Sequence, residues 1–213
     1  MNQMDYKQCR EMILYVAQKI VESEPYLTEI DMEIGDGDHG TGMKRGFSNV
    51  MKTLKERCPE SMEEVFRVTG WTLLDTMGGA SGVLFGTVFI SGISKRDNQL
   101  FWNLEDFSQV FNRSLLALKE RGKAKVGDKT MVDALEPAAE ALRLAAAKGK
   151  GLKEGFSQAA ECAGKGVEYS KNVKARFGRA KYFGEKAIGL QDAGATSVWI
   201  IFRSMSQWIE ENI

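Results

Sequence analysis

Apolar residues recur three or four positions apart along most of this 213-residue chain. That spacing predicts amphipathic helices, each with one face turned toward a core. Asn103 and Asp106 stand where a capping pair would open one of these helices. The stripes comprise Cys9, Met12, Ile13, Val16 and Ile20; Phe47, Val50, Met51 and Leu54; Met62, Val65, Phe66, Thr69 and Leu73; and Leu104, Phe107, Val110, Phe111, Leu115 and Leu118.

The remaining segments also favour helix. Residues 131–147 are rich in Ala and Leu, which are strong helix formers. Residues 197–202 have the β-propensity of a strand. The stripe that they begin nevertheless continues at helical spacing through Met205 and Ile209, so we predict a helix there. Because no segment alternates with period two, we predict an all-α fold of about eight helices and no sheet.

Glycine-rich turns separate the predicted helices. Lys148–Gly151 is too short to divide domains, so we predict one domain over residues 1–213. Four turns stand out, and in a helical bundle alternate turns lie at the same end. Several of them could therefore converge on one ligand. The four turns cover residues 35–42, 78–82, 122–127 and 189–194.

The composition narrows the protein class. The chain carries 29 basic and 29 acidic residues, and this neutral balance argues against nucleic-acid partners and against a polybasic membrane anchor. No apolar run approaches the roughly 20 residues of a membrane span, and the N-terminus lacks the apolar centre of a signal peptide. Cys9, Cys58 and Cys162 are far apart and read as reduced thiols. We expect a cytoplasmic protein with no membrane segment.

Three carboxylates, on Asp31, Asp36 and Asp38, lie within eight residues of one another beside several glycines. A hard divalent cation with oxygen ligands would remove their mutual repulsion. A solvated acidic turn is the alternative. An EF-hand is excluded, because position 12 is Phe47 counted from Asp36 and Gly42 counted from Asp31, where a Glu is needed. Magnesium that shares phosphate oxygens fits best.

His39 is the only histidine in the chain. It follows two candidate metal ligands and precedes Gly40, Thr41 and Gly42, so we expect it to contact a phosphate, although lone histidines are commonly structural. One histidine cannot build a His-rich zinc site.

Three further segments are candidates for phosphate contact. The sequence GGASG at 78–82 precedes a helix expected to begin near Ser81, whose free N–H groups would attract an anion. The 122–130 turn resembles a Walker A loop but has Asp128 where that motif needs Lys. Five cations between 171 and 181 could offset a polyphosphate. The alternatives are a plain helix–helix turn, a solvated Gly/Lys loop and a solvated basic run.

Five ordered motifs resemble the nucleotide-binding L subunits of dihydroxyacetone kinases, over nearly the whole chain. The motifs are GDGDHG at 35–40, GGASG at 78–82 with LFGT at 84–87, GDKTMVDAL at 127–135, GRA-x-Y-x-GE at 178–185, and IG-x-QDAGATS at 188–197. The resemblance implies a barrel of antiparallel helices with ADP or ATP across one end. It also implies two magnesium ions held by Asp31, Asp36 and Asp38, which with His39 would form the catalytic group.

The same resemblance implies how the nucleotide is held. The turn from His39 to Gly42 and the start of the helix after GGASG would line the phosphates, and Arg179 would pair with a phosphate. Gly122 and Met131 would flank the adenine. The turn at Asp192 would close the site. The full set of expected nucleotide contacts is His39, Gly40, Thr41, Gly42, Gly79, Ala80, Ser81, Gly122, Met131, Arg179, Asp192, Ala193 and Gly194.

Two positions depart from the family pattern. Ala193 stands where the family usually has proline, which loosens the turn without removing a ligand. Thr41 and Gly42 stand where the family often has bulkier or amide side chains, which favours a reshaped phosphate contact.

The resemblance implies that a separate K subunit holds the ketose covalently while this chain supplies the nucleotide phosphate. We expect a resident ADP that a phosphotransferase-system M subunit recharges, with dihydroxyacetone as acceptor. Direct use of ATP, a tetrulose or other short ketose as acceptor, and a non-catalytic nucleotide-binding regulator remain alternatives. A homodimer also remains open.

Overall fold

The computed structural model describes residues 3–213, in which nine α-helices account for most of the chain. Two short 3-10 helices, η1 (Ser91–Ile93) and η2 (Arg179–Ala187), interrupt the connections. The all-α prediction is confirmed. The helices are α1 (Tyr6–Glu22), α2 (Glu24–Ile34), α3 (His39–Glu56), α4 (Met62–Thr76), α5 (Gly79–Ile90), α6 (Leu104–Gly122), α7 (Val132–Ala147), α8 (Leu152–Ser170) and α9 (Ala193–Asn212).

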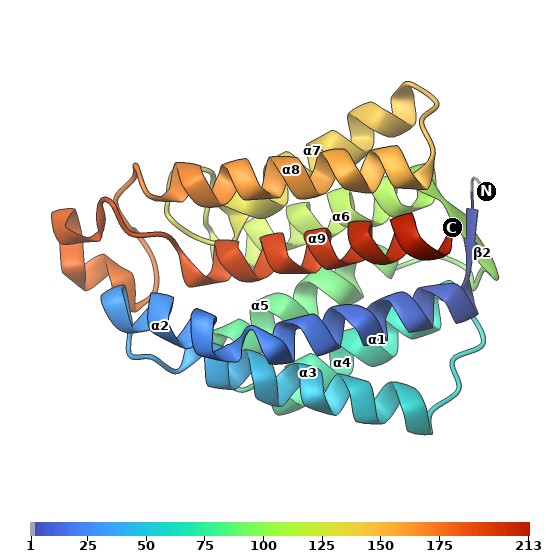
Figure 1. The fold of residues 1–213 in the computed structure, drawn as a ribbon, viewed down its shortest axis with the longest axis horizontal. Coiled ribbons are helices and arrows are strands. Elements are labelled where there is room, and N and C mark those ends of the chain that lie inside the picture. The colour runs from blue at the N-terminus through green and yellow to red at the C-terminus, as the bar shows by residue number, and fades with distance from the viewer. Residues whose placement is uncertain (1–2) are drawn as a thin grey trace.

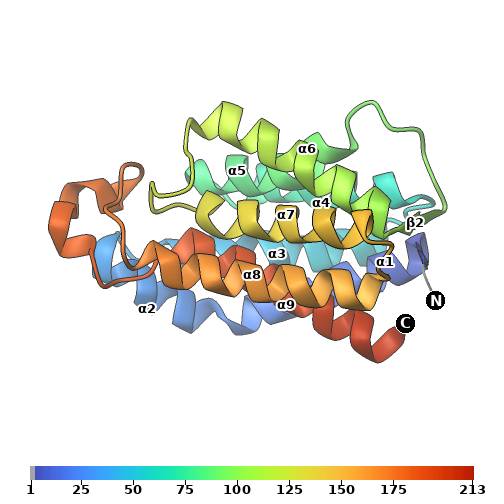
Figure 2. The same ribbon diagram turned by 90° about the horizontal axis from the view of Figure 1, so that it is seen from above.

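Eight of these helices form a closed ring. From α3 to α9 each helix packs on the next, and α1 packs on both α3 and α9. The long helices run along one axis in Figures 1 and 2, and α2 lies at one end of the ring. Both chain ends and β2 lie at the opposite end (Figure 1). The barrel of about eight antiparallel helices is therefore confirmed, with α2 as an addition.

The predicted stripes line the inside of the ring. All their members are buried except Met51, which is half-buried. Aromatic rings fill the centre, where Phe66 lies 5.0 Å from Trp102 and 6.2 Å from Phe111, measured between ring centroids. The predicted pair at Asn103 and Asp106 forms a complete capping box at the start of α6.

The prediction of no sheet is wrong at one place. Strand β1 (Gln3–Asp5) pairs antiparallel with β2 (Phe101–Asn103), so that Met4 lies opposite Trp102. Both side chains are buried while most of their neighbours are exposed. Three residues are too few to display an alternating pattern, and the partner strand lies almost 100 positions away. Only the folded chain brings the two strands together.

Helix boundaries near the glycine turns also differ from expectation. No stripe predicted α2, and Asp31 belongs to its last turn rather than to the loop. The helix that follows the acidic turn begins at His39, and the helix expected near Ser81 begins at Gly79. The C-terminal segment is helical, as predicted. None of the helices in residues 3–213 combines the length and apolarity needed to cross a membrane.

A buried ion pair fixes the connection that leads into β2. Glu63 of α4 has no exposed surface and accepts hydrogen bonds from the Gln99 N–H at 2.7 Å and from Trp102 Nε1 at 3.2 Å. Arg96 approaches the same carboxylate at 3.4 Å and also pairs with Asp106 at 2.8 Å. The network ties α4, α6 and β2 together at the end of the barrel where the chain termini lie.

We expect Glu63→Ala to lower the free energy of unfolding by about 2–4 kcal/mol, because the Trp102 and Gln99 N–H groups lose their acceptor and Arg96 keeps only Asp106 as an ion-pair partner. Urea denaturation followed by circular dichroism measures the change. Glu161→Ala, which removes an exposed i,i+4 pair with Lys165, serves as control and should leave stability nearly unchanged. Equal stabilities of the two variants would contradict the prediction.

Candidate metal and phosphate site

The three predicted carboxylates meet at one point. Asp31 projects from the last turn of α2, and Asp38 occupies the N-cap position of α3. One oxygen from each of Asp31, Asp36 and Asp38 lies within 4.8 Å of the other two. A Cβ atom at Gly35 would lie 2.2 Å from Asp31 Oδ1, so only glycine fits beside that carboxylate.

The electrostatics of this group favour a cation. Burial raises the pKa of Asp38, and the charges of Asp36 and Asp31 raise it further. Arg179 opposes these effects, and its Nε atom lies 2.6 Å from Asp36 Oδ2. The donor atoms are all carboxylate oxygens, which are the ligands that magnesium prefers. The residues therefore fit a divalent cation beside phosphate oxygens.

His39 and Gly40 lie at the carboxylate loop, but their side-chain positions face the protein. The His39 imidazole is buried, with Nε2 2.8 Å from Ser197 Oγ, and burial lowers the pKa of the ring. A Cβ at Gly40 would lie 2.2 Å from Thr28 Oγ1, so glycine is needed where α2 and α3 touch. The geometry thus favours structural roles for the His39 ring and for Gly40, and the His39 backbone N–H donates to Asp31 Oδ2 at 3.3 Å.

The turn before α5 lies against the first turns of α3. Gly78 and Gly79 have φ values of +78° and +60°, and a Cβ at Gly79 would meet no atom within 4 Å. Gly42 of α3 faces Met77, and Arg45 donates hydrogen bonds to the carbonyls of Thr76 and Met77. The open backbone at the start of α5 can therefore approach a ligand closely.

Side chains in these two turns leave room for a ligand. Ala80 is exposed and Ser81 is half-buried, while Thr41 is exposed and donates its hydroxyl to the Asp38 carbonyl at 2.9 Å. Because Gly42 faces Met77, the first turn of α3 and the 78–81 turn lie together at one end of the barrel.

The residues expected at the adenine and at the closing turn also gather at this end. Met131 precedes α7 and lies beside Gly194, where an added Cβ would be 3.4 Å from the Met131 Cβ. Gly122 ends α6 next to Leu84 of α5. Met131 and Gly194, which are distant in sequence, are thus in contact. Gly122 lies against Leu84 and not against either of them.

Asp192 opens the last helix. Its carboxylate accepts the Ala195 N–H at 2.7 Å as an N-cap, and its own N–H donates to Ser170 Oγ at 3.1 Å. Burial raises the pKa of Asp192 to about 7, against the lowering effect of the Ala195 N–H. Ala193 is the first helical residue of α9, a position that also suits proline, so the departure there leaves the helix start intact.

Sequence reasoning missed several residues that shape this end. Lys129 and Asp133 are almost fully buried, and Asp133 accepts the N–H groups of Gly127 at 2.6 Å and Thr130 at 2.7 Å. Ser197 supplies the partner of His39. Lys129 and Asp133 lie in the GDKTMVDAL motif, but nothing in its spacing indicates which side chains turn inward.

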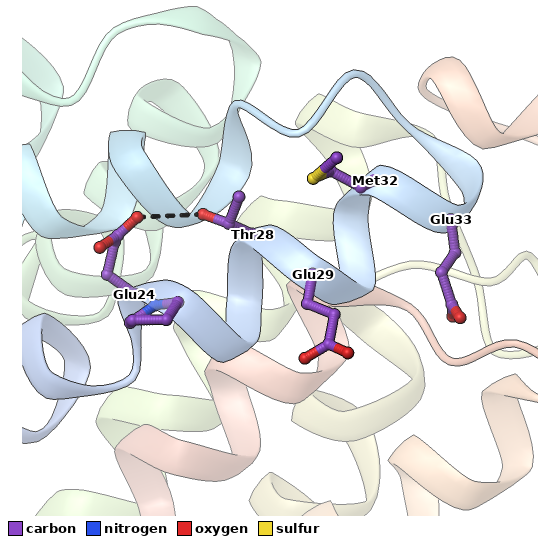
Figure 3. A pocket seen from close by; sticks show the side chains of 6 residues that line it. Glu24, Thr28, Glu29, Met32 and Glu33 are labelled. Carbon is purple, nitrogen blue, oxygen red and sulfur yellow. Dashed lines mark hydrogen bonds between the residues drawn. The ribbon is translucent and has the colours of Figure 1, made fainter.

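A surface hollow of about 510 Å³ lies on the outer face of α2, and none of the three metal-ligand candidates lines it. Figure 3 shows its lining, in which three glutamates flank Met32. A surface of that charge would repel phosphates, so we place the nucleotide elsewhere. The lining residues are Glu24, Pro25, Thr28, Glu29, Met32 and Glu33.

The fold and the carboxylate cluster define a class of protein, an all-helical barrel with three clustered carboxylates at one end. Residues 33–207 match the DAK2 domain family, and the chain belongs to that family. The resemblance to dihydroxyacetone kinase subunits is thereby confirmed.

Among its relatives is the "PEP-dependent dihydroxyacetone kinase, ADP-binding subunit DhaL" of Escherichia coli K12, 40% identical over 87% of this chain and 88% of the relative. The corresponding PTS-dependent ADP-binding subunit of Lactococcus lactis is 37% identical over 88% of this chain and 90% of the relative. The crystal structure of the dihydroxyacetone kinase of C. freundii with AMP-PNP and Mg²⁺ shares the fold, with a TM-score of 0.73 and 23% identity over 97% of this chain and 35% of that chain.

The titration of Asp192 gives a pH-dependent prediction for the nucleotide-free protein. An unfolded aspartate has a pKa near ~3.9, so the native state binds this proton more tightly and loses stability as pH rises from about 4 to 7. Asp192→Asn keeps the N-cap oxygen and removes the titration. We expect the variant to gain stability relative to the native sequence by up to about 1.4 kcal/mol per pH unit in that window, and a constant difference above it.

Urea denaturation in EDTA at pH 5, 6, 7 and 8 measures this difference. A difference between the two proteins that does not change with pH would show that the Asp192 carboxyl titrates normally.

Proposed function

We propose that this chain is the nucleotide-binding subunit of a dihydroxyacetone kinase, holding ADP or ATP through magnesium. The carboxylate cluster at the barrel end is the observation that carries the proposal, because three carboxylate oxygens within 4.8 Å of one another suit a divalent cation. The support from relatives is that two named ADP-binding subunits match over nearly their whole length, at 40% and 37% identity.

In this assignment Asp31, Asp36 and Asp38 hold two magnesium ions. Bound magnesium neutralises charge that develops on the transferred phosphoryl group. The chain itself would contribute positioning: backbone N–H groups at the starts of α3 and α5 would bind the phosphates, and Arg179, whose Nε atom lies 2.6 Å from Asp36 Oδ2, would pair with one of them. Gly122 and Met131 would flank the adenine, and the turn from Asp192 to Gly194 would close the site.

The proposed donor scheme keeps ADP bound as a cofactor that a phosphotransferase-system partner recharges from phosphoenolpyruvate. The partners would be a K subunit that carries the ketose and an M subunit that supplies the phosphoryl group. Support comes from identity: the PEP- and PTS-dependent subunits are 35–40% identical to this chain, whereas the longer Triokinase/FMN cyclase of Homo sapiens is 29% identical and matches over 34% of its length.

Dihydroxyacetone is the proposed acceptor. The D-erythrulose kinase of Mycolicibacterium smegmatis, 28% identical over 91% of this chain, keeps a tetrulose acceptor as the second candidate. Assays of the chain with K subunits that bind each ketose would decide, because the acceptor in this scheme lies outside this chain.

We expect Asp36→Asn and Asp38→Asn each to abolish magnesium-dependent ADP binding. Mutation of a residue that only hydrogen-bonds to a metal ligand costs roughly 10–100-fold in metal affinity, so loss of a direct ligand should cost more than that. Titration calorimetry with Mg-ADP measures the dissociation constant. Asp97→Asn, in an exposed loop position before β2, is the matched control and should bind normally.

Native affinity for Mg-ADP in either Asp36→Asn or Asp38→Asn would contradict the assignment of these aspartates as metal ligands. Without metal, Asp38→Asn should be at least as stable as the native sequence, because it removes one charge from a repelling group, and Asp36→Asn removes such a charge together with its ion pair to Arg179. A folded variant that fails to bind ADP therefore reports on the site and not on the fold.

The donor scheme predicts that the purified chain retains ADP in nearly stoichiometric amount. Heat or acid extraction followed by chromatography identifies the nucleotide, and radiolabelled ATP measures its exchange. Slow exchange is expected of a resident cofactor. Rapid exchange with free ATP would replace the scheme with direct use of ATP.

A further inference from the structure

Residues 171–190, here called the strap, connect α8 to α9 and carry η2. The strap extends past the ends of the neighbouring helices at one end of the barrel (Figures 1 and 2). Within it only Ala175 and Ala187 are buried. Two small side chains give little hydrophobic stabilisation, so polar contacts must hold the strap in place.

Lys129, in the loop between α6 and α7, reaches both ends of the strap. Its side chain is only 1% exposed. Its Nζ atom donates to the Ser170 carbonyl at 2.6 Å and to the Leu190 carbonyl, with the Val173 carbonyl at 3.5 Å. An ammonium group has three N–H donors, and here each has a carbonyl acceptor.

Further bonds close the base of the strap. The Gly189 N–H donates to the Lys171 carbonyl at 2.8 Å. The Arg176 N–H donates to the Asp128 carbonyl at 3.0 Å, and the Arg176 side chain lies 3.3 Å from the Asp128 carboxylate. Lys129 therefore belongs to a contact between the α6–α7 loop and the strap.

A buried ammonium is costly, and an apolar side chain of similar size would fill the space with less penalty. Lys129 also has a φ of +58°, a backbone conformation unusual for a residue with a side chain. Burial lowers the pKa of Lys129, while nearby Asp192 and Asp133 oppose that shift. The hydrogen bonds to the strap give the reason for placing a lysine in this position.

The strap in turn carries Arg179 to the metal-ligand candidates, where its Nε atom is 2.6 Å from Asp36. Nothing apolar in the strap near Arg179 anchors it, since positions 176–179 are all exposed. The location of this guanidinium therefore depends on the base of the strap.

We propose that Lys129 is a positioning residue for the nucleotide site, because it joins the two ends of the strap and thereby holds Arg179 over the phosphates. This inference rests on the proposed function for its consequence in binding. Its structural part, closure of the strap by Lys129, stands independently of any ligand.

Lys129→Met tests the proposal in the full-length protein, since methionine keeps an unbranched apolar stem and removes the donors. Hydrogen exchange read by mass spectrometry should accelerate at residues 171–190 and remain unchanged in α1, α4 and α6. The Mg-ADP dissociation constant should rise about tenfold, the effect of losing roughly one charge-assisted hydrogen bond. With a K subunit, KM for the nucleotide should rise while kcat at saturation falls less than KM rises.

Lys125→Met is the matched control, because it makes the same change at an exposed position of the same loop. It should alter neither exchange nor affinity. Lys129→Gln retains two N–H donors and should give intermediate values for both measurements.

Unchanged exchange in the strap of Lys129→Met would overturn the proposal. Faster exchange in all helices would also overturn it, because Lys129 would then support the whole barrel. Faster strap exchange with native nucleotide affinity would refute the positioning role. If the native sequence itself binds no Mg-ADP, the proposed function fails, while exchange in the strap still decides whether Lys129 closes it.

Discussion

Mutual repulsion among Asp31, Asp36 and Asp38 is the constraint around which this end of the molecule is built. Their oxygens lie within 4.8 Å of one another, and the pKa of Asp38 is raised by burial and by its two neighbours. Glycine at position 35 is required by the close approach of Asp31. Three carboxylates held together by the backbone store unfavourable energy that Arg179 relieves in part and a divalent cation can relieve further.

The fold brings the N-termini of several helices together at one end of the barrel. Because the helices alternate in direction, the turns before α3, α5, α7 and α9 all lie at the end opposite the chain termini. Helix N-termini carry unpaired N–H groups and a positive dipole end, so their convergence favours an anionic ligand beside the three carboxylates and the cation that they would hold. The opposite end is closed by the Glu63 network and the short sheet, and it serves stability instead.

The strap is held mainly by polar contacts, whereas the barrel is held by its apolar core. Its contacts are few and polar: Lys129 at its base, Arg176 with Asp128, and Arg179 with Asp36. Segments with little buried apolar surface open at low free-energy cost, which suits a region that, in the proposed function, would admit and retain a nucleotide. A buried lysine costs more than an apolar residue, but it fixes the two ends of an exposed loop in one arrangement.

The amino-acid sequence by itself determined the helical fold, the capping box at Asn103 and the carboxylates of the acidic turn, because these follow from local spacing and side-chain chemistry. Tertiary structure decided the rest. The imidazole of His39 turns to Ser197, 158 positions away, and Met4 pairs with Trp102 across the short sheet. Lys129 becomes a buried clamp only when α8 and the start of α9 bring their carbonyls to it. Such contacts join residues remote in sequence, and no local pattern encodes which distant partner a polar side chain will meet.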